Sequence, residues 1–135
     1  ILGDNVFQSN LKEHARAFIK QDQGARLLLR EVPDPQRFGV AEIRDGMVLG
    51  IEEKPKEPKS NYAIIGVYFY DSTVFNIIRT LKPSARGELE ITDVNNAYIR
   101  KGQLAYDILE GWWTDAGTFE SLARANDLVL REPPK

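Results

Sequence analysis

The stretch ILGDNVFQSNLKEHARAFIKQDQGARLLL, residues 1–29, decides the fold class. ILGDN has the character of the end of a buried strand, and residues 11–21 have the pattern of an amphipathic helix. One face of this helix is apolar and consists of Leu11, Ala15, Phe18 and Ile19. After a glycine, residues 25–29 form a short apolar strand. A strand, a helix and a strand of this length predict a βαβ unit, with a parallel pair of strands joined by a right-handed crossover.

The rest of the chain continues as strands and helices. Residues 39–43 and 47–51 flank Asp45-Gly46, which is a strong hairpin signal, and residues 63–70 form the strongest strand. Two helices are expected next, one capped by Ser72 or Thr73 and running to about Leu81, the other capped by Thr92 and ending near Gly102. A strand over residues 103–109 precedes a last helix from Thr118, with Leu122, Ala125, Leu128 and Val129 facing inward. This order predicts an α/β fold with a mixed sheet.

Composition narrows the classes of function. The 135 residues suffice for one domain, and the net charge of −2 gives no reason to expect nucleic acid or an anionic membrane as a partner. The chain has no cysteine, which excludes thiolate metal sites, and no apolar run near the roughly 18 residues of a membrane span. A cytoplasmic location is therefore expected. The single histidine, His14, is expected at the surface, which argues against a histidine-dependent nucleophilic triad.

Two carboxylates follow predicted strands, at the edge where ligands bind in open α/β sheets. Asp4 ends the first strand, where it either caps the turn or contacts a ligand. Asp115 lies in GWWTDAGT, residues 111–118, where it is either an acid at the start of the last helix or a ligand-contacting group. Of the adjacent Trp112 and Trp113, one is expected in the core. Together the two aspartates are the ligand type that Mg²⁺ takes when it also holds substrate phosphates.

Two loops carry cations that are candidates for binding phosphate. Lys54 precedes a proline, which is expected to hold the lysine backbone extended and so fix where the ammonium projects. The adjacent carboxylate of Glu53 can accept hydrogen bonds from sugar hydroxyls, although a solvated charge run is the alternative for this stretch. Arg86 lies beside a glycine and can approach a ligand closely. Thr92 and Asp93, further along that loop, are interpreted as helix-capping residues.

Five motifs follow one another along the chain: LGDN, RFGV, EEKPKEPKSNYAIIGVYFYD, LKPSARGELEITDVNNAYI and WWTDAGT. This set resembles the sugar-1-phosphate nucleotidylyltransferase family, and within it the members that transfer dTMP to glucose 1-phosphate. The resemblance extends to about Leu130 and implies a Rossmann-like three-layer nucleotide-diphospho-sugar transferase fold with a mixed sheet. Family members begin with a strand and a glycine-rich basic loop that holds the nucleotide. That part is missing, so residues 1–135 are expected to be an N-terminally truncated, single domain fragment.

The resemblance also implies a role for each candidate residue. Asp4 and Asp115 correspond to the two aspartates that hold Mg²⁺, and Glu53 corresponds to the carboxylate that binds sugar hydroxyls. The other correspondences are Lys54 and Arg86 with the phosphate-binding lysine and arginine, Gly39 and Ile64 with sugar-contacting positions that act through the backbone, and Trp113 with the aromatic residue ahead of the metal aspartate. Phe38 departs from the family pattern, in which a tyrosine is common, and so lacks the hydroxyl.

The implied reaction is Mg²⁺-dependent transfer of dTMP from dTTP to glucose 1-phosphate, which yields dTDP-glucose and pyrophosphate. Lys54 and Arg86 would hold the attacking phosphate, and positioning and electrostatics would carry the catalysis. One alternative is the same chemistry with UTP and glucose 1-phosphate or with GTP and mannose 1-phosphate. Another is that the chain by itself is an inactive module that binds a sugar phosphate or associates with itself. A homo-oligomer is expected because a truncated sheet has an exposed edge.

Overall fold

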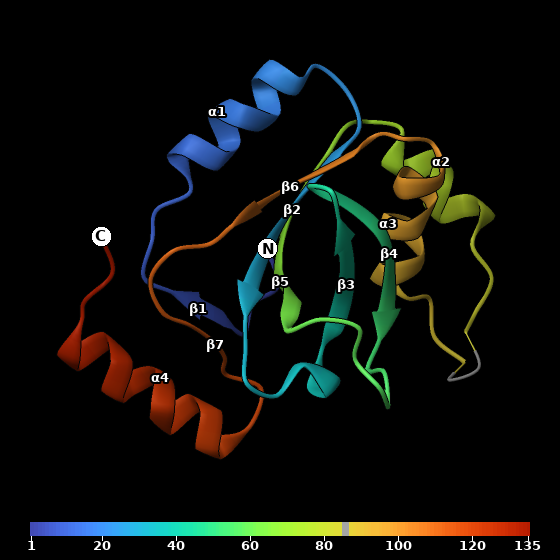
Figure 1. Ribbon diagram of the computed structural model, residues 1–135. Coiled ribbons are helices and arrows are strands. Elements are labelled where there is room, and N and C mark those ends of the chain that lie inside the picture. Colours follow the sequence, from blue (N-terminus) through green and yellow to red (C-terminus); the bar gives the residue numbers. More distant parts are fainter. Residues whose placement is uncertain (85–86) are drawn as a thin grey trace.

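A five-stranded mixed sheet forms the centre of the fold (Figure 1). The computed structural model describes residues 1–84 and 87–135. In sheet order the strands are β4 (Met47–Glu53), β3 (Gly39–Arg44), β5 (Tyr62–Tyr70), β2 (Ala25–Glu31) and β6 (Leu104–Ile108). β2 and β6 are parallel, whereas the β2–β5, β3–β4 and β3–β5 pairs are antiparallel. The expected mixed sheet is confirmed.

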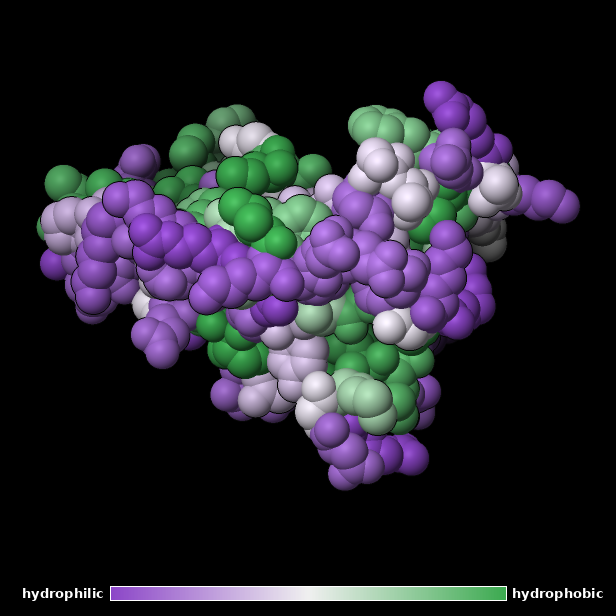
Figure 2. All heavy atoms as spheres, turned by 90° about the horizontal axis from the view of Figure 1, so that it is seen from above, coloured by the Kyte–Doolittle hydropathy of each residue, from purple (hydrophilic) through white to green (hydrophobic). Residues whose placement is uncertain are grey.

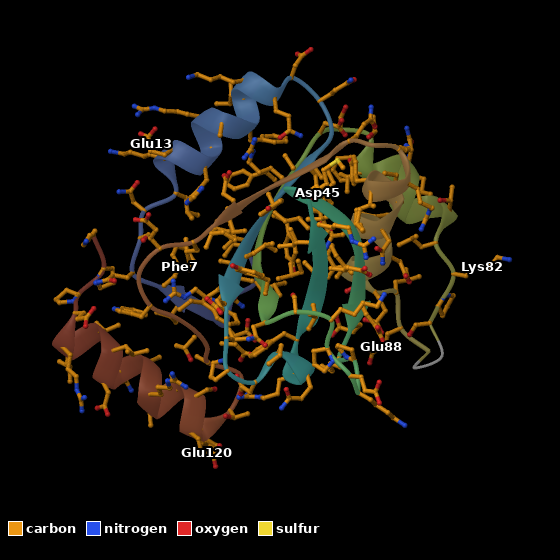
Figure 3. The ribbon with its side chains drawn as sticks, viewed as in Figure 1. Phe7, Glu13, Asp45, Lys82, Glu88 and Glu120 are labelled. Carbon is orange, nitrogen blue, oxygen red and sulfur yellow. The ribbon has the colours of Figure 1, made fainter. Side chains whose placement is uncertain are left out.

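The β3–β4 hairpin forms where Asp45-Gly46 predicts it. Both turn residues have positive φ, 51° for Asp45 and 75° for Gly46, as in a type I′ turn, whose twist matches that of the strands it joins. Figure 3 shows Asp45 at this turn. At the other end of the hairpin, Gly39 lies directly opposite Glu53. The register shifts by one residue between Glu42 and Ile43, so the turn and this β-bulge together bring the two candidate site residues opposite each other.

The described residues form four α-helices: α1 (Lys12–Gln21), α2 (Val74–Thr80), α3 (Ile91–Arg100) and α4 (Phe119–Arg131). Figure 1 shows α2 and α3 on one side of the sheet, and α1 and α4 towards the other. A short 3₁₀ turn, η1 (Pro35–Arg37), leads into β3. Within residues 1–84 and 87–135, no helix has the length and apolar character needed to cross a membrane.

The first strand does not form the expected parallel pair with β2. Instead, β1 (Asn5–Phe7) pairs antiparallel with β7 (Trp113–Asp115) in a separate two-stranded sheet. The parallel neighbour of β2 is β6. The strand–helix–strand order indicates element types but not neighbours, and β2 already has β5 on one side and β6 on the other. The βαβ prediction was therefore wrong in its pairing.

The start of the chain also differs from the expected buried strand. Ile1 and Leu2 are 73% and 50% exposed, and Asp4 lies in a turn that precedes β1. The Leu2 N–H donates to the Gly66 carbonyl of β5 at 2.8 Å, so the segment runs beside the large sheet. The aliphatic residues of ILGDN predicted a strand that ends at Asp4, whereas β1 begins one residue after Asp4.

The core lies on both faces of the large sheet, because β2 is apolar through its central residues. Leu27 and Leu29 point to one face and pack with residues of the β3–β4 hairpin. Leu28 points to the other face and packs with Ile65, Val67 and Leu109. Side chains alternate along a strand, and a strand covered on both faces has the continuous apolar run that β2 shows.

Some apolar residues that were predicted to face inward are exposed. Ile19 is 76% exposed on α1, and on α4 Leu122 and Val129 are 48% and 36% exposed, while Ala125 is buried as expected. Helical spacing identifies an apolar face, but it does not show how much of that face a neighbouring element covers. Figure 2 shows apolar residues reaching the surface on both sides of a polar band.

Asp71 connects the start of α2 with α3 and with the loop before β2. Its carboxylate accepts the Gly24 N–H at 2.6 Å, the Thr73 N–H at 3.0 Å and the Tyr98 hydroxyl at 2.8 Å. Burial raises the pKa of Asp71, but the Thr73 hydroxyl, which donates to Oδ1 at 2.5 Å, and the other three hydrogen bonds outweigh it and lower the pKa to about 2. The N-terminus of α2 is thus satisfied by Asp71, and the side chain of the expected cap Thr73 makes no capping bond.

We expect Asp71→Asn to lower the free energy of unfolding at pH 7 by about 1–3 kcal/mol, because it removes the charge from these hydrogen bonds. A carboxylate with a depressed pKa stabilises the fold above its unfolded pKa, and this contribution is lost as pH falls through the folded pKa. The difference between the two proteins should therefore shrink from about pH 4 towards pH 2. Urea unfolding at several pH values measures it, and a difference that does not change with pH would contradict a role for the charge.

Candidate functional site

A cavity of about 210 Å³ brings together predicted site residues from distant parts of the chain. Its walls come from the start of the chain, the open end of the β3–β4 hairpin, β5, the first turn of α3, and β7. The predicted residues that line it are Asp4, Gly39, Glu53, Lys54, Ile64, Trp113 and Asp115. Arg86, the remaining predicted site residue, lies outside the described residues.

The small sheet places Asp4 beside Asp115. Its register sets Asn5 opposite Asp115, and the Ala116 N–H donates to the Asp4 carbonyl oxygen at 2.7 Å. Asp115 Oδ1 accepts the Gly117 N–H at 2.7 Å. A Cβ built on Gly117 would lie 2.9 Å from Asp115 Oδ1 and 3.4 Å from Asp4 Oδ2. The two carboxylates therefore converge on the same point, and a glycine leaves room for them.

The side-chain amide of Asn5 fixes this arrangement. Its Oδ1 accepts the backbone N–H of Gly66 in β5 and the indole N–H of Trp113, both at 2.8 Å. Its Nδ2 donates to Asp4 Oδ1 at 2.9 Å. One amide thus links the large sheet, the small sheet and the first carboxylate.

Glu53 is held in place by α3. Thr92 Oγ1 donates to Glu53 Oε2 at 2.9 Å. Thr92 lies inside the helix, which begins at Ile91, and the N-cap position belongs to Glu90. The prediction of Thr92 as a cap was wrong, because a threonine near a helix start fits the capping pattern whether its hydroxyl turns to the backbone or to a neighbouring carboxylate.

Lys54 has a φ of 45°, so its backbone is left-handed rather than extended as predicted. A following proline disfavours the right-handed α conformation, but it does not exclude the left-handed one. The Lys54 N–H donates to the Phe38 carbonyl at 3.0 Å, which ties the bend to the neighbouring strand. A lysine with positive φ costs conformational energy and needs such support. The bend turns the chain away from β4 at the cavity wall.

An aromatic pair forms another part of the wall. The rings of Phe38 and Trp113 pack edge to face, with centroids 5.2 Å apart. The Arg37 guanidinium lies 5.4 Å from the centroid of the Phe38 ring and pairs with Asp34 at 2.9 Å. These residues also line a second cavity of about 390 Å³ next to the first. Trp112 is buried, as expected for one of two adjacent tryptophans.

His14, which was expected at the surface, lies outside both cavities but is only partly exposed. Its Nδ1 lies 2.9 Å from Asp107 Oδ2, and its side chain is only 18% exposed. Arg26 pairs with the other oxygen of the same carboxylate. The face of α1 that the sequence marks as polar is thus joined to β6 through a shared aspartate.

Several further residues line the cavity that the sequence did not mark as binding residues, among them Tyr68, Thr92 and Asn95. Tyr68 lies on the same strand face as Ile64, because side chains alternate along β5. The prediction that Ile64 contacts a ligand could therefore have been extended to Tyr68. Burial raises the pKa of Tyr68 to about 12, and the carboxylates of Glu53 and Asp4 add to the shift. The hydroxyl therefore remains a hydrogen-bond donor at neutral pH.

The chain belongs to the nucleotidyl transferase family, since residues 1–132 match the model of that family. One curated relative is the glucose-1-phosphate thymidylyltransferase of Mycolicibacterium smegmatis, 47% identical over 132 residues. Another is the low-salt glycan biosynthesis nucleotidyltransferase Agl11 of Haloferax volcanii, 42% identical over 133 residues. These alignments cover 95% and 97% of this chain but only 46% and 37% of the relatives. The chain therefore spans less than half the length of these two relatives.

Solved structures confirm the α/β fold. A Bacillus anthracis protein assigned as a glucose-1-phosphate thymidylyltransferase, solved with sucrose, matches with a TM-score of 0.89 and 58% identity. That match covers 95% of this chain and 52% of the other. A UDP-glucose pyrophosphorylase complexed with UDP-glucose matches with a TM-score of 0.84, over 97% of this chain and 55% of the other. At 23% identity, the second match shows the fold alone.

Gly66→Ala is expected to destabilise the fold by about 1–3 kcal/mol through overpacking, because a Cβ there would lie 2.6 Å from Asn5 Nδ2 and 2.9 Å from Leu2 Cβ. Gly50→Ala is the matched control, since a Cβ at this strand glycine would have no described atom within 4 Å. Urea unfolding followed by tryptophan fluorescence compares the two variants. Equal stabilities would contradict the tight packing of Asn5 against β5.

Proposed function

We propose that the protein is a sugar-1-phosphate nucleotidyltransferase that transfers dTMP from dTTP to glucose 1-phosphate, with release of pyrophosphate. The proposal rests on the single cavity that holds the two aspartates together with Glu53 and Lys54. Curated relatives named glucose-1-phosphate thymidylyltransferase favour these two substrates. Because the chain spans less than half the length of these relatives, we assign to it the binding of the sugar phosphate in this reaction.

The two convergent carboxylates fit Mg²⁺. Within the described ranges, no group of three or more His, Asp or Glu side chains is placed to hold a metal ion. Asp4 and Asp115 would therefore supply two oxygen ligands and leave the remaining positions to water and substrate phosphates, the arrangement that Mg²⁺ favours. Bound there, the ion would neutralise phosphate charge during transfer.

Different residues are assigned to different parts of the acceptor substrate, the sugar phosphate. Lys54 supplies a positive charge for the phosphate of the sugar, and Arg86 is proposed as a second cation for it. Glu53, oriented by Thr92, accepts hydrogen bonds from ring hydroxyls. Fixing the sugar phosphate in this way prepares one of its oxygens for in-line attack on the α-phosphate of the nucleotide, with no covalent enzyme intermediate.

Other substrate pairs remain as alternatives. UTP with glucose 1-phosphate or GTP with mannose 1-phosphate would use the same metal-binding carboxylates and the same cations, because these groups are assigned to phosphates, which all the substrate pairs share. Agl11, a nucleotidyltransferase of glycan biosynthesis whose name specifies no sugar 1-phosphate, is a relative of similar sequence identity. A panel of nucleoside triphosphates and sugar 1-phosphates in one pyrophosphate-release assay separates these alternatives.

Lys54→Ala is expected to lower turnover by at least ~10²-fold in a protein of the relatives' full length, which is the scale of losing one preorganised electrostatic contact. Lys59→Ala is the control, because Lys59 pairs with Glu42 at 2.6 Å outside this cavity. Pyrophosphate release with dTTP, Mg²⁺ and glucose 1-phosphate measures both. Near-normal turnover of Lys54→Ala would contradict the assignment of Lys54 to the phosphate of the sugar. The wild-type 135-residue chain, run beside them, shows whether it is active or only a binding module.

Asp115→Asn is expected to raise the Mg²⁺ concentration needed for half-saturation by at least about 10-fold, a loss seen even for residues that only support metal ligands. Asp127→Asn is the control, because this exposed aspartate lies on α4, away from the cavity. Calorimetric titration of Mg²⁺ in the presence of glucose 1-phosphate measures binding independently of turnover. Equal Mg²⁺ affinities of the two variants would contradict the metal assignment.

A further inference from the structure

Asn95 has a buried side-chain nitrogen without a hydrogen-bond partner. The residue lies on α3, is 1% exposed and lines the 210 Å³ cavity. Among the described residues, Asn95 Nδ2 is the buried side-chain polar atom that no protein group satisfies. Buried donors are nearly always paired, and leaving one unpaired costs free energy. An unsatisfied donor in a cavity wall indicates that its partner comes from outside the chain.

The other half of the same amide is already committed. Tyr70 donates its hydroxyl proton to Asn95 Oδ1 at 2.5 Å. Burial raises the pKa of Tyr70, and Tyr68 and Tyr98 raise it further, so the hydroxyl keeps the proton that it donates. The Tyr70 ring is also stacked between those of Tyr68 and Tyr98, at 5.9 and 5.6 Å. This fixed hydroxyl sets the orientation of the amide and leaves Nδ2 as the free end.

The neighbourhood of Asn95 indicates the chemistry of the missing partner. Thr92 lies one helical turn earlier, on the same side of α3, and orients Glu53. A carboxylate can only accept hydrogen bonds, whereas an amide nitrogen can only donate them. A sugar hydroxyl does both. A hydroxyl between these two groups would donate its proton to Glu53 and accept one from Asn95.

We propose that Asn95 is a substrate-binding residue whose Nδ2 donates to a ring hydroxyl oxygen of the sugar phosphate. This rests on the proposed function and extends it. The same sugar hydroxyl would donate a hydrogen bond to Glu53 and accept one from Asn95. This contact also makes Asn95 a specificity residue, since a sugar without that hydroxyl leaves a buried donor unpaired, the situation in which binding sites discriminate most strongly.

The variants must separate loss of the donor from loss of packing. Asn95→Ala would leave the Tyr70 hydroxyl unpaired, so it is made in the Tyr70→Phe background and compared with Tyr70→Phe alone. Both proteins then lack the hydrogen bond between the Tyr70 hydroxyl and the Asn95 amide, and they differ only in whether the amide of Asn95 is present. Thermal unfolding of each shows that it is folded at the temperature of the binding experiment.

The ligands are glucose 1-phosphate and its 2-, 3-, 4- and 6-deoxy analogues, titrated calorimetrically in the presence of Mg²⁺. Tyr70→Phe/Asn95→Ala is expected to bind glucose 1-phosphate roughly 5- to 10-fold more weakly than Tyr70→Phe, the equilibrium factor of one hydrogen bond. For one deoxy analogue, the one that lacks the contacted hydroxyl, the two proteins should bind equally. For the other analogues the difference should persist.

An equal loss of affinity for every analogue would assign Asn95 to packing and overturn the proposal. An unchanged affinity for glucose 1-phosphate would also overturn it, because a trapped water would then be the partner of Nδ2. Failure of the proposed function has a different signature. Asn95-dependent binding of the sugar phosphate without pyrophosphate release by a protein of the relatives' full length would refute nucleotidyl transfer and leave this contact standing.

Discussion

The pairing of β1 with β7 is the constraint on which the candidate site depends. Each strand has three residues, too few to be stable by themselves. The Asn5 amide compensates, because it bonds the backbone of β5 and the indole of Trp113 as well as the neighbouring Asp4. The two aspartates converge because Asn5 holds β1 against β5 and also holds Trp113 of β7.

The same constraint explains why backbone geometry near the cavity is so restricted. Gly66 lies where a side chain would collide with Asn5, and Gly117 lies where one would collide with Asp115. Lys54 adopts a positive φ at the end of β4. Sites built from fixed backbone positions hold their side chains accurately, and strain at such positions persists only when the surrounding structure supports it. Here the Lys54 N–H bond to Phe38 provides that support.

The sequence predicted the element types and seven of the residues that line the cavity, but not the pairing of strands beyond the β3–β4 hairpin. Alternation and turn chemistry predicted the β3–β4 hairpin because those signals are local. The partners of β1 and β2 depend on competition among strands far apart in sequence, which no local pattern records. Asp4, Glu53, Lys54 and Asp115 were candidates from their residue types and positions, and the motif resemblance added Gly39, Ile64 and Trp113. The contact of the partly exposed His14 with Asp107 was missed because the partner is in β6, and a polar residue on a helix does not reveal a partner so far along the chain.

Asn95 and Tyr68 were missed for a related reason, and they change the chemical character of the site. The predicted residues alone gave acceptors, cations and backbone contacts. The structure adds two uncharged donors, the hydroxyl of Tyr68, whose pKa is raised by burial and by nearby carboxylates, and the Asn95 amide nitrogen, which no described protein group satisfies. A simple phosphate or carboxylate only accepts hydrogen bonds, whereas a hydroxyl both donates and accepts and can therefore use an acceptor-only and a donor-only group side by side. The polar inventory of the cavity therefore favours a sugar phosphate over a simple phosphate or a carboxylic acid.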